Sequence, residues 1–247
     1  MPPRLQNIHV DDVPTVTQLY TDPSSYEAPI KELEAHPDAV AEPNAIINSK
    51  VGLINADVTS MHIDAIVNAA NNGLRGGGGI DGAIHARAGP ELYDACAALP
   101  ADSRGVRCPT GQAKITDSFD LPCGKIIHTP GPVWYAMTDK AEAERLLRSC
   151  YRSSLDVAIE NGCRTIVFPP ISTNIYGYPN AKAAEAALSE VRMWLEEKGK
   201  DVPVDKIVFT NVDKPDMDAY LHFIPKYFPP APAAPTAHGA EDGKSSI

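Results

Sequence analysis

The chain has few features that would suit a membrane or an oxidising compartment. No run approaches the roughly 20 apolar residues that cross a bilayer, and the first residues form no apolar signal core. The five cysteines are an odd number and none are spaced as CxxC, so neither a disulfide framework nor a zinc site is expected. We therefore expect a cytoplasmic or nuclear protein with no membrane contact, no metal and no cofactor.

Basic residues are also scarce. The chain has 22 Lys and Arg against 32 Asp and Glu, a net charge of −10. Duplex nucleic acid is not expected as a partner, because binding its phosphates requires a basic face. An anionic ligand could still bind through backbone N–H groups, which the net charge does not count. Nothing in the sequence indicates an obligate oligomer, so we expect a monomer.

What the chain does have is an alternation of strand and helix patterns. Strands are predicted at 51–56, 63–68, 112–117, 125–129, 164–170 and 206–211, and helices at 80–99, 139–161, 180–198 and 215–227. Strands that alternate with helices indicate an α/β fold with a mostly parallel sheet covered on both faces. In such sheets ligands bind at the carboxyl ends of the strands, in the loops that lead to the helices.

The two ends of the chain differ from this central part. Residues 1–45 are predicted to be an extension packed on the domain at 46–228. In this extension Asp11 or Asp12 could cap a helix through Tyr20, and Ser24 or Ser25 another through about residue 35. The Pro/Ala-rich tail at 229–247 has no hydrophobic period and is predicted to be disordered.

The first candidate loop follows the strand at 63–68 and leads into the helix at 80–99. It holds the amide Asn71, four glycines at 76–79, and Asp81 where the helix begins. Glycines let a backbone approach a ligand closely, and a helix N-terminus favours an anion. The loop formally contains GxGxxG, but the acidic residue that a dinucleotide-binding fold places about 20 residues later is not at a strand tip. No Gly-Lys-Ser/Thr follows either, so the P-loop pattern is absent.

The second candidate loop spans 169–179, between the most apolar strand and a long helix. It offers the hydroxyls of Ser172 and Thr173, several backbone N–H groups, and the flat ring of Tyr176 for a sugar. Pro179 and Asn180 are explained by the start of the following helix, but the polar and aromatic residues before them are not.

Together these segments resemble a known family, the macrodomains of the MacroD type. The motifs that carry the resemblance are ADVT at 56–59, IVNAAN at 66–71, GGGGIDG at 76–82, GQAKIT at 111–116, IHTPGP at 127–132 and ISTNIYGYP at 171–179. They cover roughly residues 45–228, in order and at matching spacing. The resemblance implies a three-layer α/β/α sandwich with a mixed, mostly parallel sheet that binds ADP-ribose.

The resemblance also implies roles for individual residues. Asp57 would accept a hydrogen bond from the adenine amino group beside the Val58 backbone, and a residue near Thr210 or Asn211 would stack on adenine. Asn71 and Asp81 would be catalytic. The implied ligand-binding residues are Asp57, Val58, Asn71, Gly76, Gly77, Gly78, Gly79, Ile80, Ser172, Thr173, Asn174, Ile175 and Tyr176.

The implied reaction is hydrolysis of mono-ADP-ribose from acidic side chains of proteins, with O-acetyl-ADP-ribose as a further substrate. Asp81 can orient or deprotonate the attacking water, a role that contributes about 10²–10⁴-fold. It could instead be only an acid in the first turn of the helix, worth about 0.3–1 kcal/mol. Asn71 could likewise only hold its loop. A non-catalytic ADP-ribose reader and a phosphatase acting on ADP-ribose-1″-phosphate stay open as alternatives.

Two positions depart from the family pattern, in which glycine is usual. Ala56 precedes Asp57, and Asn174 stands in the second loop, where asparagine could supply a positive φ but would intrude on the ligand. Among the other polar residues, His85 and His128 are expected in the core. His62 is expected to be exposed, and Arg75 to be a solvated loop tip.

Overall fold

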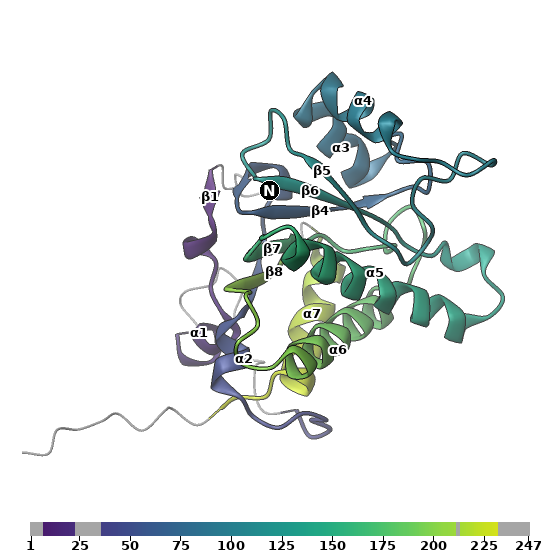
Figure 1. Cartoon of the computed structure of the whole chain (residues 1–247). Helices are drawn as coiled ribbons and strands as arrows, with labels where there is room; N and C mark the ends of the chain where they lie inside the picture. Colours follow the sequence, from purple (N-terminus) through teal and green to yellow (C-terminus); the bar gives the residue numbers. More distant parts are fainter. Residues whose placement is uncertain (1–6, 23–35, 211–212, 232–247) are drawn as a thin grey trace, which may run out of the picture.

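A computed structural model describes residues 7–22, 36–210 and 213–231 (Figure 1). Its centre is a six-stranded sheet in the order β2-β8-β7-β4-β6-β5. The strands are β2 (Val51–Ile54), β4 (Ala65–Ala70), β5 (Lys114–Asp117), β6 (Lys125–Pro130), β7 (Thr165–Phe168) and β8 (Lys206–Thr210). Only β5 runs antiparallel to its neighbour β6, so the mixed, mostly parallel sheet is confirmed.

Helices cover both faces of this sheet. On one face lie α3 (Gly79–Ala88) and α4 (Pro90–Ala98), and on the other α5 (Lys140–Glu160), α6 (Asn180–Lys198) and α7 (Lys214–Tyr227) (Figure 1). Successive strand side chains point to opposite faces. Val67 therefore joins the core under α5 and α6, while Ile66 joins the core under α3 and α4. The three-layer α/β/α architecture is confirmed.

The single helix predicted at 80–99 is wrong: the chain forms two helices there. Gly89 separates them with a φ of +88°, and Pro90 opens α4 at its first turn. A side chain at Gly89 would also have its Cβ 2.8 Å from a carboxylate oxygen of Asp120. The apolar positions Leu92 and Cys96 continue the helical period, which is why the pattern concealed the break.

Several strand and helix ends also differ from the prediction. The strand predicted at 63–68 is β4, two residues later than expected and preceded by the short β3 (Met61–His62). The strand predicted at 164–170 stops at Phe168, before two prolines that cannot donate to a sheet. The strands at 51–56 and 112–117 are shorter, as β2 and β5. The sequence analysis missed α2 (Ala45–Ser49), which Asn44 caps by accepting from the backbone N–H of Ile47.

In the first residues described, the expected helix through Tyr20 begins later than predicted. Asp11 and Asp12 form a short 3₁₀ turn, η1 (Val10–Asp12), and Thr15 caps α1 (Val16–Thr21). Before them β1 (Ile8–His9) pairs with β3, and Lys206 of β8 donates to two carbonyl oxygens of this segment. The predicted helix near 24–35 and most of the 229–247 tail lie outside the described residues.

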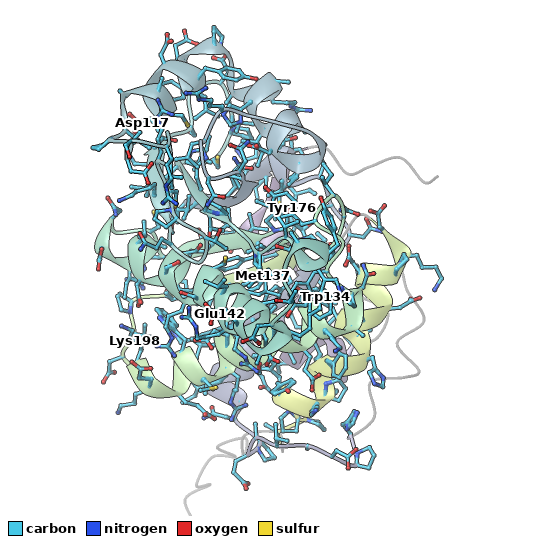
Figure 2. All side chains as sticks on the ribbon, turned by 90° about the vertical axis from the view of Figure 1, so that its right-hand side faces the viewer. Asp117, Trp134, Met137, Glu142, Tyr176 and Lys198 are labelled. Atoms are coloured by element: carbon cyan, nitrogen blue, oxygen red, sulfur yellow. The ribbon has the colours of Figure 1, made fainter. Side chains whose placement is uncertain are left out.

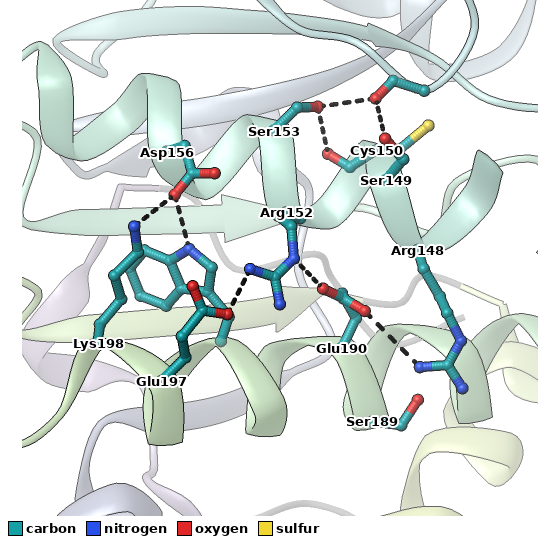
Figure 3. Close-up of polar contacts among 12 residues, drawn as sticks. Arg148, Ser149, Cys150, Arg152, Ser153, Asp156, Ser189, Glu190, Glu197 and Lys198 are labelled. Carbon is teal, nitrogen blue, oxygen red and sulfur yellow. Dashed lines mark hydrogen bonds and ion pairs between the residues drawn. The ribbon is translucent and has the colours of Figure 1, made fainter. Parts of the chain in front are cut away.

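Ion pairs join α5 to α6 on the outer surface (Figure 3). Arg152 donates to the buried carboxylate of Glu190 at 2.6 Å and to Glu197 at 2.7 Å. One turn along, the Trp194 indole donates to Asp156 at 2.9 Å. These bonds satisfy polar groups that the packing of the two helices would otherwise leave without water.

No helix among the described residues is long and apolar enough to cross a membrane.

Candidate functional site

Two adjoining cavities lie at the carboxyl ends of the strands. The first, of about 250 Å³, is bounded by the loops that follow β4, β6 and β7; the second, of about 330 Å³, lies near the ends of β2 and β8. Four residues line both cavities: Gly79, Ile80, Pro170 and Asn174. The two cavities therefore form a divided cleft at the carboxyl ends of the strands, where the sequence analysis predicted a ligand.

The cleft gathers most of the residues singled out from the sequence. The first cavity is lined by Asn71, Gly77, Gly78, Gly79, Ile80, Asp81, Ser172, Asn174, Ile175 and Tyr176. The second adds Asp57 and Val58. Gly76 and Thr173 line neither. The Gly76 carbonyl accepts from the Asn71 side chain at 2.6 Å, and the Thr173 hydroxyl donates to Asp216 at 3.3 Å. Both residues therefore hydrogen-bond to side chains that line the cleft.

The glycine loop brings the N-terminus of α3 to the first cavity. Gly79 has a φ of +62°, which side chains rarely adopt, and a Cβ on Gly82 would lie 2.3 Å from the Gly77 carbonyl oxygen. Gly78 is the N-cap and makes no side-chain cap hydrogen bond. The first N–H groups of α3 are therefore available to an anion, and the helix dipole adds to the attraction.

Asp81 is buried at the inner end of this cavity and is held by three side chains. Its Oδ1 accepts from Asn68 Nδ2 at 2.8 Å and lies 3.1 Å from His85 Nδ1. Its Oδ2 accepts from Asn71 Nδ2 at 3.2 Å. Burial alone would lower the pKa of His85, but the hydrogen bond to Asp81 leads the opposing contributions and the pKa is raised to about 10. The pairing with Asp81 thus favours the protonated form of His85, a role that the sequence analysis missed.

The pKa of His128, on β6, is shifted in the opposite direction. Burial, followed by the nearby charge of His85, lowers the pKa of His128 to about 4, so its ring is neutral. Its Nδ1 accepts from Asn68 Nδ2 at 3.1 Å, and its Nε2–H donates to the Thr116 hydroxyl at 2.9 Å. As expected, both histidines are buried.

The second loop follows β7. Ser172 and Gly177 have a positive φ here, at +69° and +66°, and Asn174 does not, so Asn174 does not serve the backbone role considered from the sequence. The buried Ser172 hydroxyl has no partner among the described residues and lies against Gly131, where a Cβ would come within 2.1 Å of it. A buried hydroxyl without a partner is unusual in a folded protein, and this one belongs to a residue that lines the first cavity.

Tyr176 lies at the rim of the first cavity. Its carbonyl accepts from the Trp134 backbone N–H at 2.9 Å, which fixes the loop to η4 (Trp134–Ala136). Figure 2 shows Tyr176 and Trp134 close together on this side of the molecule. Burial raises the pKa of the Tyr176 hydroxyl, so it remains protonated and can donate to a sugar oxygen.

The second cavity is acidic. Asp57 caps η3 (Val58–Ser60) by accepting from the Thr59 backbone N–H at 3.0 Å, and Asp216 lies across the cavity. Burial raises the pKa of Asp216, whose carboxylate accepts from Asn180 at 2.6 Å and from Thr173. The sequence analysis missed Asp216. Thr210 lines the same cavity, while Asn211 lies outside the described residues.

The remaining candidates take no part in the cleft. His62 was expected to be exposed, but it belongs to β3 and is half-buried, because its ring stacks on His9 with centroids 4.5 Å apart. Arg75 is exposed, as a solvated loop tip would be. Across the described ranges, no group of three or more His, Cys, Asp or Glu side chains is arranged to hold a metal ion.

Comparison with known proteins agrees with this geometry. Residues 67–187 match the family model of the Macro domain. The chain is 51% identical over 174 residues to the Macro domain-containing protein CT2219 of Chlorobaculum tepidum, covering 70% of this chain and 94% of that protein. The chain belongs to the macrodomain family.

Within that family it is similar to proteins of the MacroD type. It is 45% identical over 185 residues to the ADP-ribose glycohydrolase MACROD1 of Rattus norvegicus, covering 75% of this chain and 68% of that protein. The Trypanosoma brucei macrodomain, solved in complex with ADP, superposes with a TM-score of 0.68 at 33% identity. That match covers 88% of this chain and 76% of the other.

Proposed function

We propose that this chain binds ADP-ribose and hydrolyses mono-ADP-ribose from acidic side chains of proteins. The observation that carries the proposal is the position of Asp81 and Asn71 in the wall of a cavity that also presents the N-terminus of α3. A relative at 45% identity is named an ADP-ribose glycohydrolase, and a solved macrodomain was obtained with ADP, which supports the same ligand class.

In this proposal the ligand spans the divided cleft. The diphosphate lies where the two cavities meet. It binds the N–H groups around Gly79 and Ile80 and lies beside the Ser172 hydroxyl. The adenosine occupies the second cavity, where the Asp57 carboxylate accepts from the adenine amino group. The terminal ribose enters the first cavity beside Asn71. Backbone donors explain how a chain with a net charge of −10 can bind a dianion.

The reaction needs a water directed at the anomeric carbon of the terminal ribose. Water oxygen bonds to this carbon while the bond to the ester oxygen breaks, and the substrate carboxylate leaves with the electron pair. Asp81 accepts the proton of the water through Oδ2, the oxygen that faces Asn71, while Oδ1 stays engaged with His85. Such general base catalysis contributes about 10²–10⁴-fold.

The test is release of ADP-ribose from a glutamate-linked mono-ADP-ribosylated protein. We expect turnover by the wild-type chain, and losses of about 10²-fold or more in Asp81→Ala and Asn71→Ala. Asp205→Ala is the matched control, because Asp205 pairs with Arg164 on the exposed surface and lines neither cavity. Full activity in Asp81→Ala would refute the mechanism.

A parallel calorimetric titration with ADP-ribose separates the alternatives. Binding without turnover would identify a non-catalytic reader, which the side chain of Asn174 in both cavities favours. Faster release of phosphate from ADP-ribose-1″-phosphate than of ADP-ribose from protein would identify a phosphatase. Parallel measurement with O-acetyl-ADP-ribose would show whether it is a further substrate.

We further propose that the protein is a monomer of the cytoplasm or nucleus whose partners are mono-ADP-ribosylated proteins. All five cysteines are free and buried, which suits a reducing compartment. Light scattering during size-exclusion chromatography should give a mass near 26.5 kDa. A mass of twice this value would refute the monomer.

A further inference from the structure

Asn68 is a fully buried amide in the middle of β4, in a strand that is otherwise apolar. It lines neither cavity itself. Its Nδ2 donates to Asp81 Oδ1 at 2.8 Å and to His128 Nδ1 at 3.1 Å, so both amide hydrogens are used. The buried Asn68 amide therefore links β4 to α3 and to β6 through hydrogen bonds.

The orientation of this amide is determined by Asp81. Asp81 offers only acceptor oxygens, so the amide must turn its NH₂ group toward that carboxylate. The same NH₂ group faces His128 Nδ1 at 3.1 Å, so the neutral ring accepts there and carries its proton on Nε2, 2.9 Å from the Thr116 hydroxyl. Were the amide reversed, the Asn68 oxygen would face the Asp81 carboxylate in a buried site, which is strongly unfavourable.

The contact also crosses between two layers of the fold. Asp81 belongs to α3, whereas Asn68 lies on the same strand that ends just before Asn71, and its register partner on β6 is His128. His85 holds the same oxygen of Asp81, but from one turn along α3, so it moves with that helix. Among the residues that the structure describes, the Asn68 bond is the one that fixes this oxygen to the sheet.

We propose that Asn68 is a positioning residue for Asp81, and that His128 and Thr116 hold Asn68 in its working orientation. By binding Oδ1 to the sheet, Asn68 turns Oδ2 toward Asn71 and the first cavity. The inference rests on the proposed function, in which Oδ2 receives the proton of the water. A shift of a catalytic group by about 1 Å is enough to cost on the order of 10²-fold in rate.

The test compares Asn68→Ala with a matched variant, Asn48→Ala. Asn48 is equally buried, donates through Nδ2 to the Pro229 carbonyl at 2.8 Å, lacks a partner for its Oδ1 as Asn68 does, and lines neither cavity. We expect both variants to lose comparable stability in urea. Only Asn68→Ala should lose kcat, by at least about tenfold, with KM and the Kd for ADP-ribose unchanged.

A second measurement reads the position of Asp81 without any turnover. In carbon-detected NMR the Asp81 carboxyl signal and the His85 ring signals should shift in Asn68→Ala and stay in place in Asn48→Ala. Equal kcat in the two variants, a change confined to KM, or unmoved Asp81 signals would each overturn the proposal. If the wild-type chain shows no hydrolysis, the proposed function fails by itself, and the NMR comparison still decides whether Asn68 positions Asp81.

Discussion

Replacing Asp81 by asparagine should destabilise the fold by an amount that depends strongly on pH. The substitution keeps the shape of the side chain but removes the charge that pairs with the buried His85 ring. His85 has its pKa raised to about 10 in the folded protein, against an ordinary value of 6.5. A group with a raised pKa stabilises the fold fully below its unfolded value, and this stabilisation is lost as the pH rises through the folded value.

The size of the effect follows from those two pKa values. Linkage between protonation and folding gives His85 a stabilising contribution of about 4 kcal/mol at pH 7 and about 1 kcal/mol at pH 9. The first figure lies within the range of about 3–5 kcal/mol measured when one partner of a buried ion pair is removed. In Asp81→Asn the pKa of His85 should fall, because the carboxylate that leads the contributions raising it is gone while the burial that lowers it remains.

Urea unfolding of the wild type and Asp81→Asn at pH 7 and pH 9 measures this directly. The difference in unfolding free energy between the two proteins should shrink by about 2–3 kcal/mol between these pH values. Asp205→Asn is the control, since its exposed pair with Arg164 should contribute about 0–1 kcal/mol at either pH. A difference that is the same at pH 7 and pH 9 would show that His85 is not charged, and would refute the reasoning.

Three further substitutions probe other parts of the structure. Gly131→Ala should displace the Ser172 hydroxyl, cost about 1–3 kcal/mol by overpacking and weaken ADP-ribose binding; unchanged calorimetric affinity would contradict the placement of the diphosphate. Asn174→Gly should strengthen ADP-ribose binding by up to about tenfold, because it clears the seam between the cavities, and weaker binding would show that its amide is a ligand contact. Arg152→Ala should lower the unfolding free energy by about 1–3 kcal/mol, because it leaves the Glu190 carboxylate less well paired, while the affinity for ADP-ribose stays the same.

Much of the fold could be predicted because its signals are local. The apolar run at 165–168 can only be a buried strand between turn residues, and the helix at 180–198 has its boundaries in the sequence. The glycine run next to an acidic residue indicated where the first loop lies. The break at Gly89 also had a local signal, since Gly-Pro is a turn dipeptide, but the continuing apolar period was given more weight.

The side-chain network behind the cleft was harder to predict because its members meet only in three dimensions. His85 follows Asp81 by four residues on one helix face, so their pairing could have been inferred from spacing alone. Asp216 could not, because its partners Thr173 and Asn180 lie 43 and 36 residues earlier in the chain. The state of His128 depends on burial and on neighbouring charge, neither of which a sequence displays.

The cleft also straddles the shortest strand pairing in the six-stranded sheet. β4 pairs with β6 over six residues but with β7 over only two, Ala65 with Ile166 and Ile66 with Val167. β4 and β7 lead into two of the three loops that bound the first cavity. Beyond these pairs the strands diverge toward the ligand, so little backbone hydrogen bonding joins the two halves of the sheet there. A ligand that contacts both loops would therefore link the two halves of the sheet where β4 and β7 separate. The affinity for the ligand would then depend partly on how readily the two halves of the sheet separate. Substitutions between β4 and β7 would change this affinity without contacting the ligand.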